Sequence, residues 1–428
     1  MSTNNLVPCP DFLLPLLIAL SLCLVAHPGS SANDQLERVF RVDDHGFRGD
    51  GKFDDTQIFR NIWKIACSSS REARILIPSG NTYVINPIDF GGPCQSKITL
   101  QISGNIVGPT DPEEWEGLDT TRWMYFHGII HLTIEGGGIV NGRGDKWWER
   151  ICKTGNACQE APTAFKFHKC DDLTIRDLEI INGQHTHVTF TNCHRVTASD
   201  LKIQAPSTSP NTDGIHISSS HDIDISSSEI GTGDDCVSIV GNSSTIVIRD
   251  ISCGPGHGIS IGSLGISNSW SQVRDVIVQS SILSETEFGL RIKTWQGGSG
   301  FAKDIIFQNV LMKNVGHPIV INQYYCDSFV PCLNQTSAVK VANISFVNIK
   351  GTTATSLAMM FACSDNSPCE GLYLEDVHLE SYYGGKTRSF CWMAQGSTSG
   401  LVQPPPCFSP DDSFIKQETS PGSAAQSI

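Results

Sequence analysis

A short strand-like phrase returns ten times along the chain, from residue 98 onward. It consists of an apolar residue, any residue, a second apolar residue, two polar or small residues and then an apolar or small one. The phrase begins at Ile98, Leu132, Leu173, Val196, Ile223, Ile246, Val276, Ile305, Ile344 and Leu372. Apolar residues at every second position predict strands, and the Asn, Gly, Ser and Asp residues that crowd the gaps are typical of turns. No convincing amphipathic helix lies between the phrases, so each predicts one strand of a repeating coil.

Short strands that recur in this way favour an all-β fold, a right-handed single-stranded parallel β-helix. Each coil of such a solenoid buries its inward side chains against the coils above and below. An antiparallel sandwich is the alternative, but short hairpin signals such as Asn-Gly between paired strands are scarce. Residues 55–70 form a predicted short capping helix at the N-terminal end, with Asp55 or Thr56 as N-cap and one apolar side made of Ile58, Ile62, Trp63, Ile65 and Ala66.

Residues 1–32 have the character of a signal peptide. Residues 12–26 form an apolar run that is too short to span a bilayer comfortably, and the small residues Ser30-Ser31-Ala32 after it suit a signal peptidase. No Lys or Arg precedes the run, which is unusual, and a buried core helix is the alternative. The expected domains are therefore a signal peptide over 1–32, the β-helix over 33–407 and a polar, flexible tail over 408–428.

Cysteine and glycosylation patterns agree with a secreted, extracellular protein. Removal of residues 1–32 would leave 14 of the 16 cysteines, and their close spacing favours bridges between neighbours in an oxidising compartment. A zinc site is the alternative, but the sequence contains no C-x-x-C pair. The expected pairs are Cys152/Cys158, Cys326/Cys332, Cys363/Cys369, Cys236/Cys253 and Cys391/Cys407. Glycosylation sequons begin at Asn242, Asn334 and Asn343.

Composition excludes two classes of partner. The chain has 30 basic and 44 acidic residues and a formal net charge of −14, so we expect no nucleic-acid partner. No internal stretch of 18 apolar residues occurs, so we expect no membrane-spanning segment. We expect a monomer.

Polar clusters recur at the spacing of one coil. Asp213 is followed 21 and 22 residues later by Asp234 and Asp235, and His257 comes another 22 residues on. Neighbouring strands lie ~4.8 Å apart, so residues one coil apart become neighbours in space. Strand alternation points Arg291 and Lys293 to one face and Ile292 to the core. These residues are therefore expected to share one exterior groove.

Three carboxyl groups at this spacing repel one another, which raises the pKa of one and leaves a protonated carboxyl beside an ionised one. A glycosidase needs such a pair, an acid for the leaving oxygen and a base for the attacking water. The two cations suit an anionic sugar, because a guanidinium holds a carboxylate with two hydrogen bonds. Each motif alone is also typical of an ordinary turn or exposed strand, and clustered Asp residues could bind calcium, as in polysaccharide lyases. The shared coil register favours the glycosidase.

The same segments resemble the signature segments of the polygalacturonases, glycoside hydrolase family 28. The strings SPNTDGIHI, TGDDCVSI, CGPGHGISIGSLG and GLRIKTWQGG are similar to the plant branch of that family, as are VDDHGFRGDGKFDDTQIF, GIVNGRGDKWW and INQYYC. The resemblance covers roughly residues 38–400. It implies a solenoid of the pectin-lyase type that hydrolyses α-1,4 linkages between galacturonic acid units of pectin, with inversion and with neither metal nor cofactor.

The resemblance also implies the role of each site residue. Asp234 would be the general acid, Asp213 and Asp235 would hold and deprotonate the attacking water, and His257 would tune the protonation of the acid. The implied substrate-binding residues are Asn211, Arg291, Lys293 and Tyr325, and the Cys236/Cys253 pair matches a family disulfide. Because Asp234 must keep its proton and Asp213 must lose one, we expect an acidic pH optimum.

Three alternatives to a polygalacturonase stay open. The first is a hydrolase of rhamnogalacturonan or xylogalacturonan, the second a β-helix that only binds wall polysaccharide, and the third a calcium-dependent lyase. The expected inversion rests on the resemblance alone. Inverting glycosidases usually separate their carboxyl groups by ~6.5–9.5 Å and retaining ones by ~5 Å, and adjacent coils favour the shorter distance.

Overall fold

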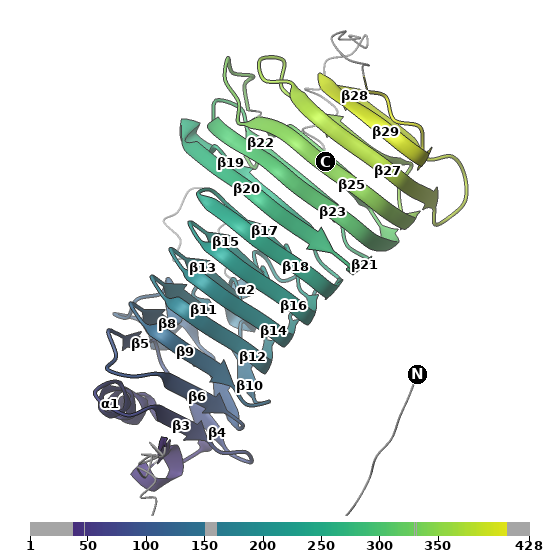
Figure 1. Ribbon diagram of the computed structural model, residues 1–428. Coiled ribbons are helices and arrows are strands. Elements are labelled where there is room, and N and C mark those ends of the chain that lie inside the picture. Colours follow the sequence, from purple (N-terminus) through teal and green to yellow (C-terminus); the bar gives the residue numbers. More distant parts are fainter. Residues whose placement is uncertain (1–36, 47, 150–160, 329, 331, 409–428) are drawn as a thin grey trace, which may run out of the picture. The chain divides into compact units, whose positions relative to one another are not determined.

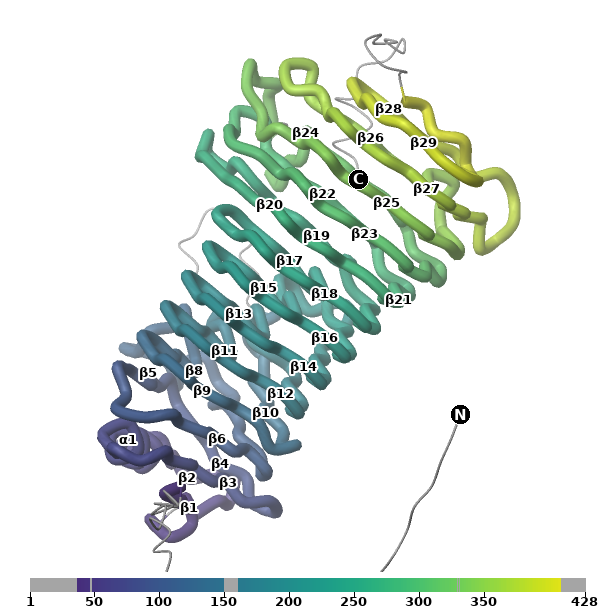
Figure 2. The backbone as a smooth tube through the Cα atoms, in the orientation of Figure 1, coloured from purple at the N-terminus to yellow at the C-terminus, as the bar shows by residue number. Residues whose placement is uncertain are grey.

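The computed structural model describes residues 37–46, 48–149, 161–328, 330 and 332–408. These residues form a right-handed parallel β-helix, in which the chain winds coil upon coil along one axis (Figures 1 and 2). The strands of successive coils pair in parallel. This confirms the predicted fold class.

Two long sheets form the walls of the described solenoid. The first has 18 strands: β1 (Arg38–Arg41), β2 (Asp50–Asp54), β3 (Ala73–Ile77), β4 (Thr82–Val84), β6 (Ile98–Ile102), β7 (Asn105–Val107), β9 (Ile130–Glu135), β10 (Ile139–Asn141), β12 (Asp171–Ile181), β14 (His194–Gln204), β16 (His221–Gly231), β18 (Ser243–Cys253), β20 (Trp270–Gln279), β21 (Ile282–Ser284), β23 (Ser299–Val315), β25 (Lys340–Thr353), β27 (Cys369–Ser381) and β29 (Ala394–Gln403). The second has 11 strands: β5 (Ile88–Gly91), β8 (Arg122–His127), β11 (Thr163–His168), β13 (Val188–Thr191), β15 (Ile215–Ser218), β17 (Val237–Ile239), β19 (Ile259–Leu264), β22 (Phe288–Trp295), β24 (His317–Tyr325), β26 (Leu357–Ala362) and β28 (Arg388–Trp392).

The ten repeated phrases stack in register within the 18-stranded sheet. The first residue of each phrase pairs with the first residue of the next, from Ile98 and Leu132 through to Ile344 and Leu372. None of these ten residues is more than 2% exposed. The apolar period along the sequence therefore becomes one continuous buried column, because each coil alone has too little surface to bury its own inward side chains.

The fifth residue of the phrase turns a corner of the coil. From β12 to β27 it adopts a positive φ, between 50° and 56°, in every coil. The residues at this corner are Asp177, Asp200, Ser227, Asp250, Ser280, Asn309, Asn348 and Asp376. Asn and Asp tolerate the left-handed conformation better than most residues, since their short side chains can hydrogen-bond locally. The polar residues within each phrase thus have a structural role in bending the strand.

The ends of the described solenoid differ from its middle, as expected. Helix α1 (Thr56–Cys67) packs its buried side against β3 and β5, and Asp55 is its N-cap residue, although the Asp55 side chain makes no capping hydrogen bond. The expected apolar side was partly wrong: Ile65 is 46% exposed, and Phe59 is buried instead. The other helical segments are short, namely α2 (Asp145–Trp148) and the 3-10 helices η1 (Val42–His45), η2 (Pro112–Trp115) and η3 (Ile266–Asn268). Phe408, the first residue of the expected tail, still packs on Phe361 in the core.

Four of the five expected disulfides are present: Cys236–Cys253, Cys326–Cys332, Cys363–Cys369 and Cys391–Cys407. The fifth pair, Cys152/Cys158, lies outside the described residues. Spacing did not reveal the bridge Cys67–Cys94, which joins the end of α1 to the loop after β5 over a separation of 27 residues. Cys170 and Cys193 are buried free thiols.

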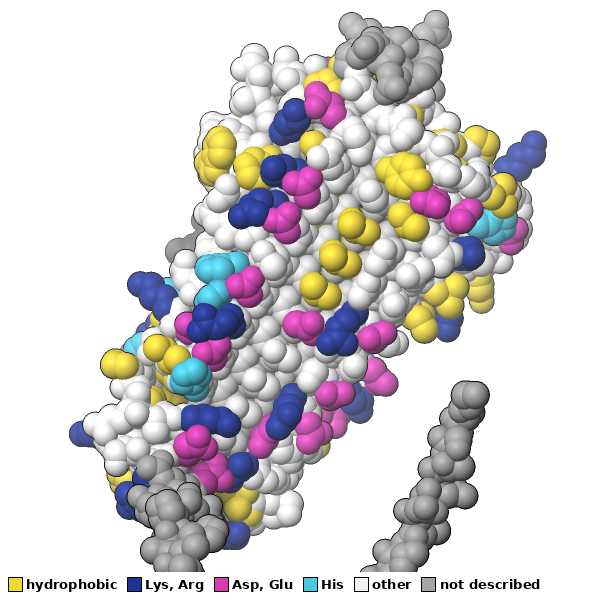
Figure 3. Space-filling view, in the orientation of Figure 1, with side chains coloured by type: hydrophobic (Ala, Val, Ile, Leu, Met, Phe, Trp, Pro, Cys, Tyr) yellow, Lys and Arg dark blue, Asp and Glu magenta, His cyan; other side chains and the backbone are white. Residues whose placement is uncertain are grey.

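The outer face of the 18-stranded sheet carries mixed charge. Figure 3 shows Lys and Arg side chains lying beside Asp and Glu side chains on this face. Cross-coil ion pairs account for part of the pattern, including Arg176 with Glu135 and Arg249 with Asp224. Within the described part of the chain, no helix combines the length and the apolar character needed to cross a membrane.

Candidate active site

All eight site residues expected from the sequence line one cavity of about 510 Å³ on the outer face of the 11-stranded sheet. They are Asn211, Asp213, Asp234, Asp235, His257, Arg291, Lys293 and Tyr325. The first five lie in the turns that lead into β15, β17 and β19, and the last three lie on β22 and β24. The coil register alone brings these segments together, since they are spread over more than a hundred residues of sequence.

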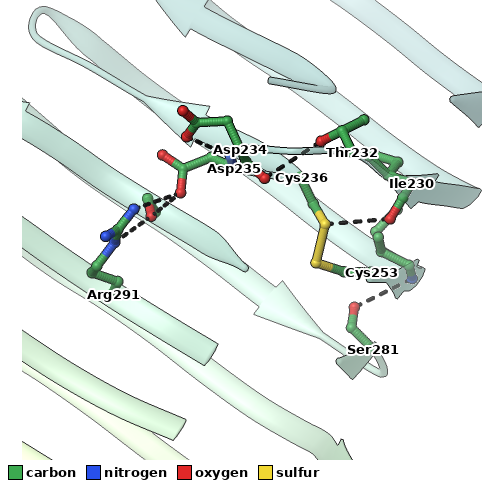
Figure 4. Close-up of a disulfide and its surroundings, with 10 residues drawn as sticks. Ile230, Thr232, Asp234, Asp235, Cys236, Cys253, Ser281 and Arg291 are labelled. Atoms are coloured by element: carbon green, nitrogen blue, oxygen red, sulfur yellow. Dashed lines mark hydrogen bonds and ion pairs between the residues drawn. A yellow bond between two sulfur atoms is a disulfide. The ribbon is translucent and has the colours of Figure 1, made fainter. Parts of the chain in front are cut away.

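The turn before β17 is held tightly against the preceding coil. A Cβ atom on Gly233 would come within 1.9 Å of the Ser209 carbonyl oxygen, so only glycine fits there. The backbone N–H of Asp235 donates to Asp234 Oδ1 at 2.7 Å. Directly after the two acids, the Cys236–Cys253 disulfide joins this turn to the end of β18 (Figure 4). The backbone therefore fixes where the two carboxyl groups point.

Asp235 is buried in an ionic cluster. Its carboxylate accepts hydrogen bonds from Arg291 Nη2 at 2.7 Å and from Lys293 Nζ at 2.9 Å, and Figure 4 shows Arg291 reaching toward it. Ser260 Oγ donates to the same carboxylate at 2.7 Å. Asp235 is 1% exposed, and the two cations are 6% and 8% exposed. The expected alternation is confirmed, because Ile292 between the cations is fully buried. In the unbound protein, however, both cations pair with an acid of the site as well as facing the cavity.

Asp234 interacts with an imidazole. His257 Nδ1 lies 3.1 Å from Asp234 Oδ1, and Asn211 Nδ2 donates to Asp234 Oδ2 at 3.3 Å. Burial opposes ionisation of Asp234, but the hydrogen bond and positive charge of His257 outweigh it and lower the pKa of Asp234 to about 2. Burial likewise disfavours the imidazolium, yet Asp234 and Glu287 together raise the pKa of His257 to about 9. At acidic pH this pair is an ionised carboxylate and an imidazolium.

Asp213 is the carboxyl group of the site that retains a proton. Ser238 Oγ donates to Asp213 Oδ2 at 2.7 Å. Desolvation in the cavity, followed by the negative charges of Asp234 and Asp235, raises the pKa of Asp213 to about 7. We expected Asp234 to hold the proton and Asp213 to lose it, whereas the two pKa values favour a proton on Asp213. The physical reason is that the imidazole contacts Asp234, whereas Asp213 is desolvated and forms no ion pair with a cation among the described residues.

Four further residues of the site did not emerge from the sequence motifs: His216, Ser238 and Glu287 line the cavity, and Ser260 hydrogen-bonds to Asp235. His216, Ser238 and Ser260 form one ladder with Arg291 across β15, β17, β19 and β22. Strand alternation could have indicated His216, since it lies between Ile215 and Ile217, which are both fully buried. Glu287, in the turn before β22, contacts His257, and nothing in the sequence pattern distinguished it.

Asp234, Asp235 and His257 bring one donor atom each within 4.8 Å of one another, which is compact enough for a cation. All three are already engaged, however. Asp235 pairs with Arg291 and Lys293, and His257 lies between Asp234 and Glu287. A hard divalent cation prefers several free carboxylate oxygens, so these contacts argue against a metal at this position. The expected absence of a metal stays a prediction.

The sequence profile of the glycosyl hydrolases family 28 matches residues 67–400. The chain belongs to family 28. A protein of Arabidopsis thaliana named as a probable polygalacturonase is 52% identical over 426 residues, 96% of this chain and 96% of that one. The polygalacturonase of Persea americana is 48% identical over 352 residues, 82% of this chain and 76% of that one. The match and these relatives group the chain with the family 28 polygalacturonases.

A solved structure supports the fold. The exopolygalacturonase of Thermotoga maritima aligns with a TM-score of 0.70, covering 88% of this chain and 93% of that one. The two sequences are 21% identical, so this similarity concerns the path of the backbone.

Proposed function

We propose that the protein is a secreted hydrolase that cleaves α-1,4 linkages between galacturonic acid units of de-esterified pectin in the cell wall. The observation that carries this proposal is the convergence of Asp213, Asp234 and Asp235 with Arg291 and Lys293 in one cavity. Carboxyl groups in different protonation states supply acid and base, and the cations supply affinity for an anionic sugar. Family membership supports the substrate class.

In the proposed reaction, Asp234 gives a proton to the glycosidic oxygen as the bond from that oxygen to the anomeric carbon breaks. A water molecule attacks the same carbon and transfers one of its protons to a carboxylate of the site. Asp234 is ionised above its pKa of about 2, so it must first gain a proton. His257 Nδ1, at 3.1 Å, is a titratable donor in hydrogen-bond contact with its carboxylate. We therefore assign to His257 the role of providing the proton that Asp234 transfers.

Substrate binding would also prepare the base. Below the pKa of Asp213, about 7, that residue is protonated and can hold the water but not deprotonate it. Asp235 is then the proton acceptor. A carboxylate bound to two cations is a weak base, but a galacturonate carboxylate that competes for Arg291 and Lys293 would loosen their hold on Asp235. Binding of an anionic sugar would thus make Asp235 more basic, whereas a neutral sugar would not.

Tyr325 is proposed to line the same subsite. Its ring lies 5.5 Å from the Lys293 ammonium and packs edge-on against Trp295. A rigid aromatic wall beside a cation suits a sugar ring that carries a carboxylate. We propose inversion at the anomeric carbon and a monomeric enzyme. Secretion is supported by the five disulfides of the described residues and by exposed side chains at Asn242, Asn334 and Asn343.

The test is activity on polygalacturonic acid. Residues 33–428 are expressed through a secretory pathway, and the reaction at about pH 5 is followed by reducing ends and by the ultraviolet absorbance of unsaturated products. A hydrolase produces reducing ends without new absorbance, and proton NMR of the first product reports its anomer. A rise in both signals would identify a lyase, and a first product with the α configuration of the substrate would contradict inversion.

Asp234→Asn tests the role of the acid. We expect kcat to fall by roughly 10²–10⁴-fold, the usual contribution of general acid catalysis, with an unchanged circular dichroism spectrum. Asp224→Asn, on the outer face of the other sheet, is the matched control and should remain active. An Asp234→Asn protein that turns over at a rate near the original would refute the assignment.

A further inference from the structure

The imidazole of His257 lies between two carboxylates that come from different coils. Nδ1 is 3.1 Å from Asp234 Oδ1, and Nε2 is 3.2 Å from Glu287 Oε2. Asp234 precedes β17, and Glu287 precedes β22. The edge of the His257 ring packs against Phe288, with the ring centroids 6.2 Å apart. Contacts on two nitrogens and one ring edge determine how the imidazole is oriented.

Ionised carboxylates only accept hydrogen bonds, so both ring nitrogens must carry hydrogen to make these contacts. A neutral imidazole has a single N–H and could satisfy only one of the two partners. The other charges around the pair do not change this conclusion. Asp235 adds a further negative charge near His257. The hydrogen bond with His257, and after it the nearby Arg291 and His317, lower the pKa of Glu287 and keep it ionised.

Glu287 lies at the border of the catalytic cavity. It lines the catalytic cavity of about 510 Å³ and also a neighbouring cavity of about 530 Å³, and His257 belongs to both. The Glu287 side chain is 57% exposed, so no buried packing depends on it. Its hydrogen bond to His257 is therefore its main interaction with the site.

We propose that Glu287 is a positioning residue for the reaction: it holds the His257 ring between two carboxylates, so that Nδ1–H keeps pointing at the acid Asp234. This inference rests on the proposed function, in which His257 supplies Asp234 with its proton. Glu287 acts through the ring, and its charge favours the imidazolium over the neutral imidazole. Loss of that charge should release the proton of His257 at a lower pH.

Glu287→Gln is the test, because glutamine keeps the shape and a hydrogen-bond acceptor but removes the charge. The pKa of His257 is measured by NMR titration of the ring C–H signals, with the signal assigned by its absence in His257→Gln. For a half-exposed ion pair, we expect this pKa to fall by roughly half a pH unit. The basic limb of the kcat/KM profile should move to lower pH by the same amount.

Glu285→Gln is the matched control, since Glu285 is on the same turn and lines the neighbouring cavity, but hydrogen-bonds to no His257 nitrogen. This variant should leave the pKa of His257 unchanged. An unchanged His257 pKa in Glu287→Gln would overturn the proposal, and so would an equal change in both variants. A KM effect of the same size at every pH would mean that Glu287 acts on the substrate charge and not through the ring.

The NMR titration needs no turnover, which separates this inference from the proposed function. A protein that is inactive on polygalacturonic acid but shows the titration change would retain the Asp234–His257–Glu287 arrangement and refute only the reaction. An active protein without the titration change would refute the role of Glu287 alone.

Discussion

Removal of the Arg291 guanidinium should destabilise the protein far more than removal of a surface arginine. Arg291 donates to the buried Asp235 at 2.7 Å and to Ser260 Oγ at 2.9 Å, and its guanidinium lies 4.0 Å from the Phe288 ring centroid. In Arg291→Gln the buried carboxylate would lose one of its two counter-charges. Breaking a buried ion pair costs about 3–5 kcal/mol, mainly because the remaining charge stays desolvated. Lys293 Nζ still lies 2.9 Å from Asp235. We therefore expect the free energy of unfolding to fall by about 3 kcal/mol, the lower end of this range.

Arg249→Gln is the control, because Arg249, like Arg291, pairs with an aspartate of an earlier coil. Its Nη2 lies 3.1 Å from Asp224 Oδ1, but the two side chains are 39% and 38% exposed. Exposed pairs contribute about 0.2–1 kcal/mol because water screens them. The two variants therefore compare similar cross-coil contacts that differ chiefly in burial.

The assay is urea unfolding at pH 5, followed by circular dichroism, with free energies taken from the midpoint and slope. Equal losses in Arg291→Gln and Arg249→Gln would refute the reasoning, since burial would then not determine the strength of the pair. Turnover measured on the same samples should fall only in Arg291→Gln, because only that cation lines the cavity.

Two further predictions concern ionisation and metal. The Asp213 carboxyl ionises at 3.8 in an ordinary setting and at about 7 in the fold. Its contribution to stability is therefore present below about pH 4 and is lost as the pH rises from about 4 to 7. Asp213→Asn should thus match the original protein in thermal stability at pH 4 and exceed it at pH 8, and an equal gain at both values would contradict the raised pKa. EDTA should leave activity on polygalacturonic acid unchanged, because Arg291, Lys293 and Glu287 already contact the donor atoms of the site. A loss of activity that Ca²⁺ restores would show that the reaction needs a metal.

The spacing of residues along the chain predicted much of this structure because the fold is a repeat. Ile98 and Leu132 are 34 residues apart, whereas Leu173 and Val196 are only 23 apart. In both cases the two residues lie one coil apart and are direct partners in the sheet. Variable loops absorb the difference in length. The same rule brought Asp213, Asp234 and His257 together. Cys67–Cys94 was missed because it joins the capping helix to a loop, where no repeat specifies the register.

The parallel solenoid and the residues of the site could be predicted from the sequence, because apolar and polar residues recur once per coil and residues one coil apart stack. The sequence could not determine how charge is distributed within that site. Asp213, Asp234 and Asp235 are the same residue type in the sequence. In the tertiary structure an imidazole contacts Asp234 and two cations contact Asp235, whereas Asp213 forms no such ion pair among the described residues. Protonation depends on such contacts and on desolvation, both of which vary over a few ångströms. For that reason the pKa difference between Asp213 and Asp234, and the contact of Glu287 with His257, could be found only in the folded protein.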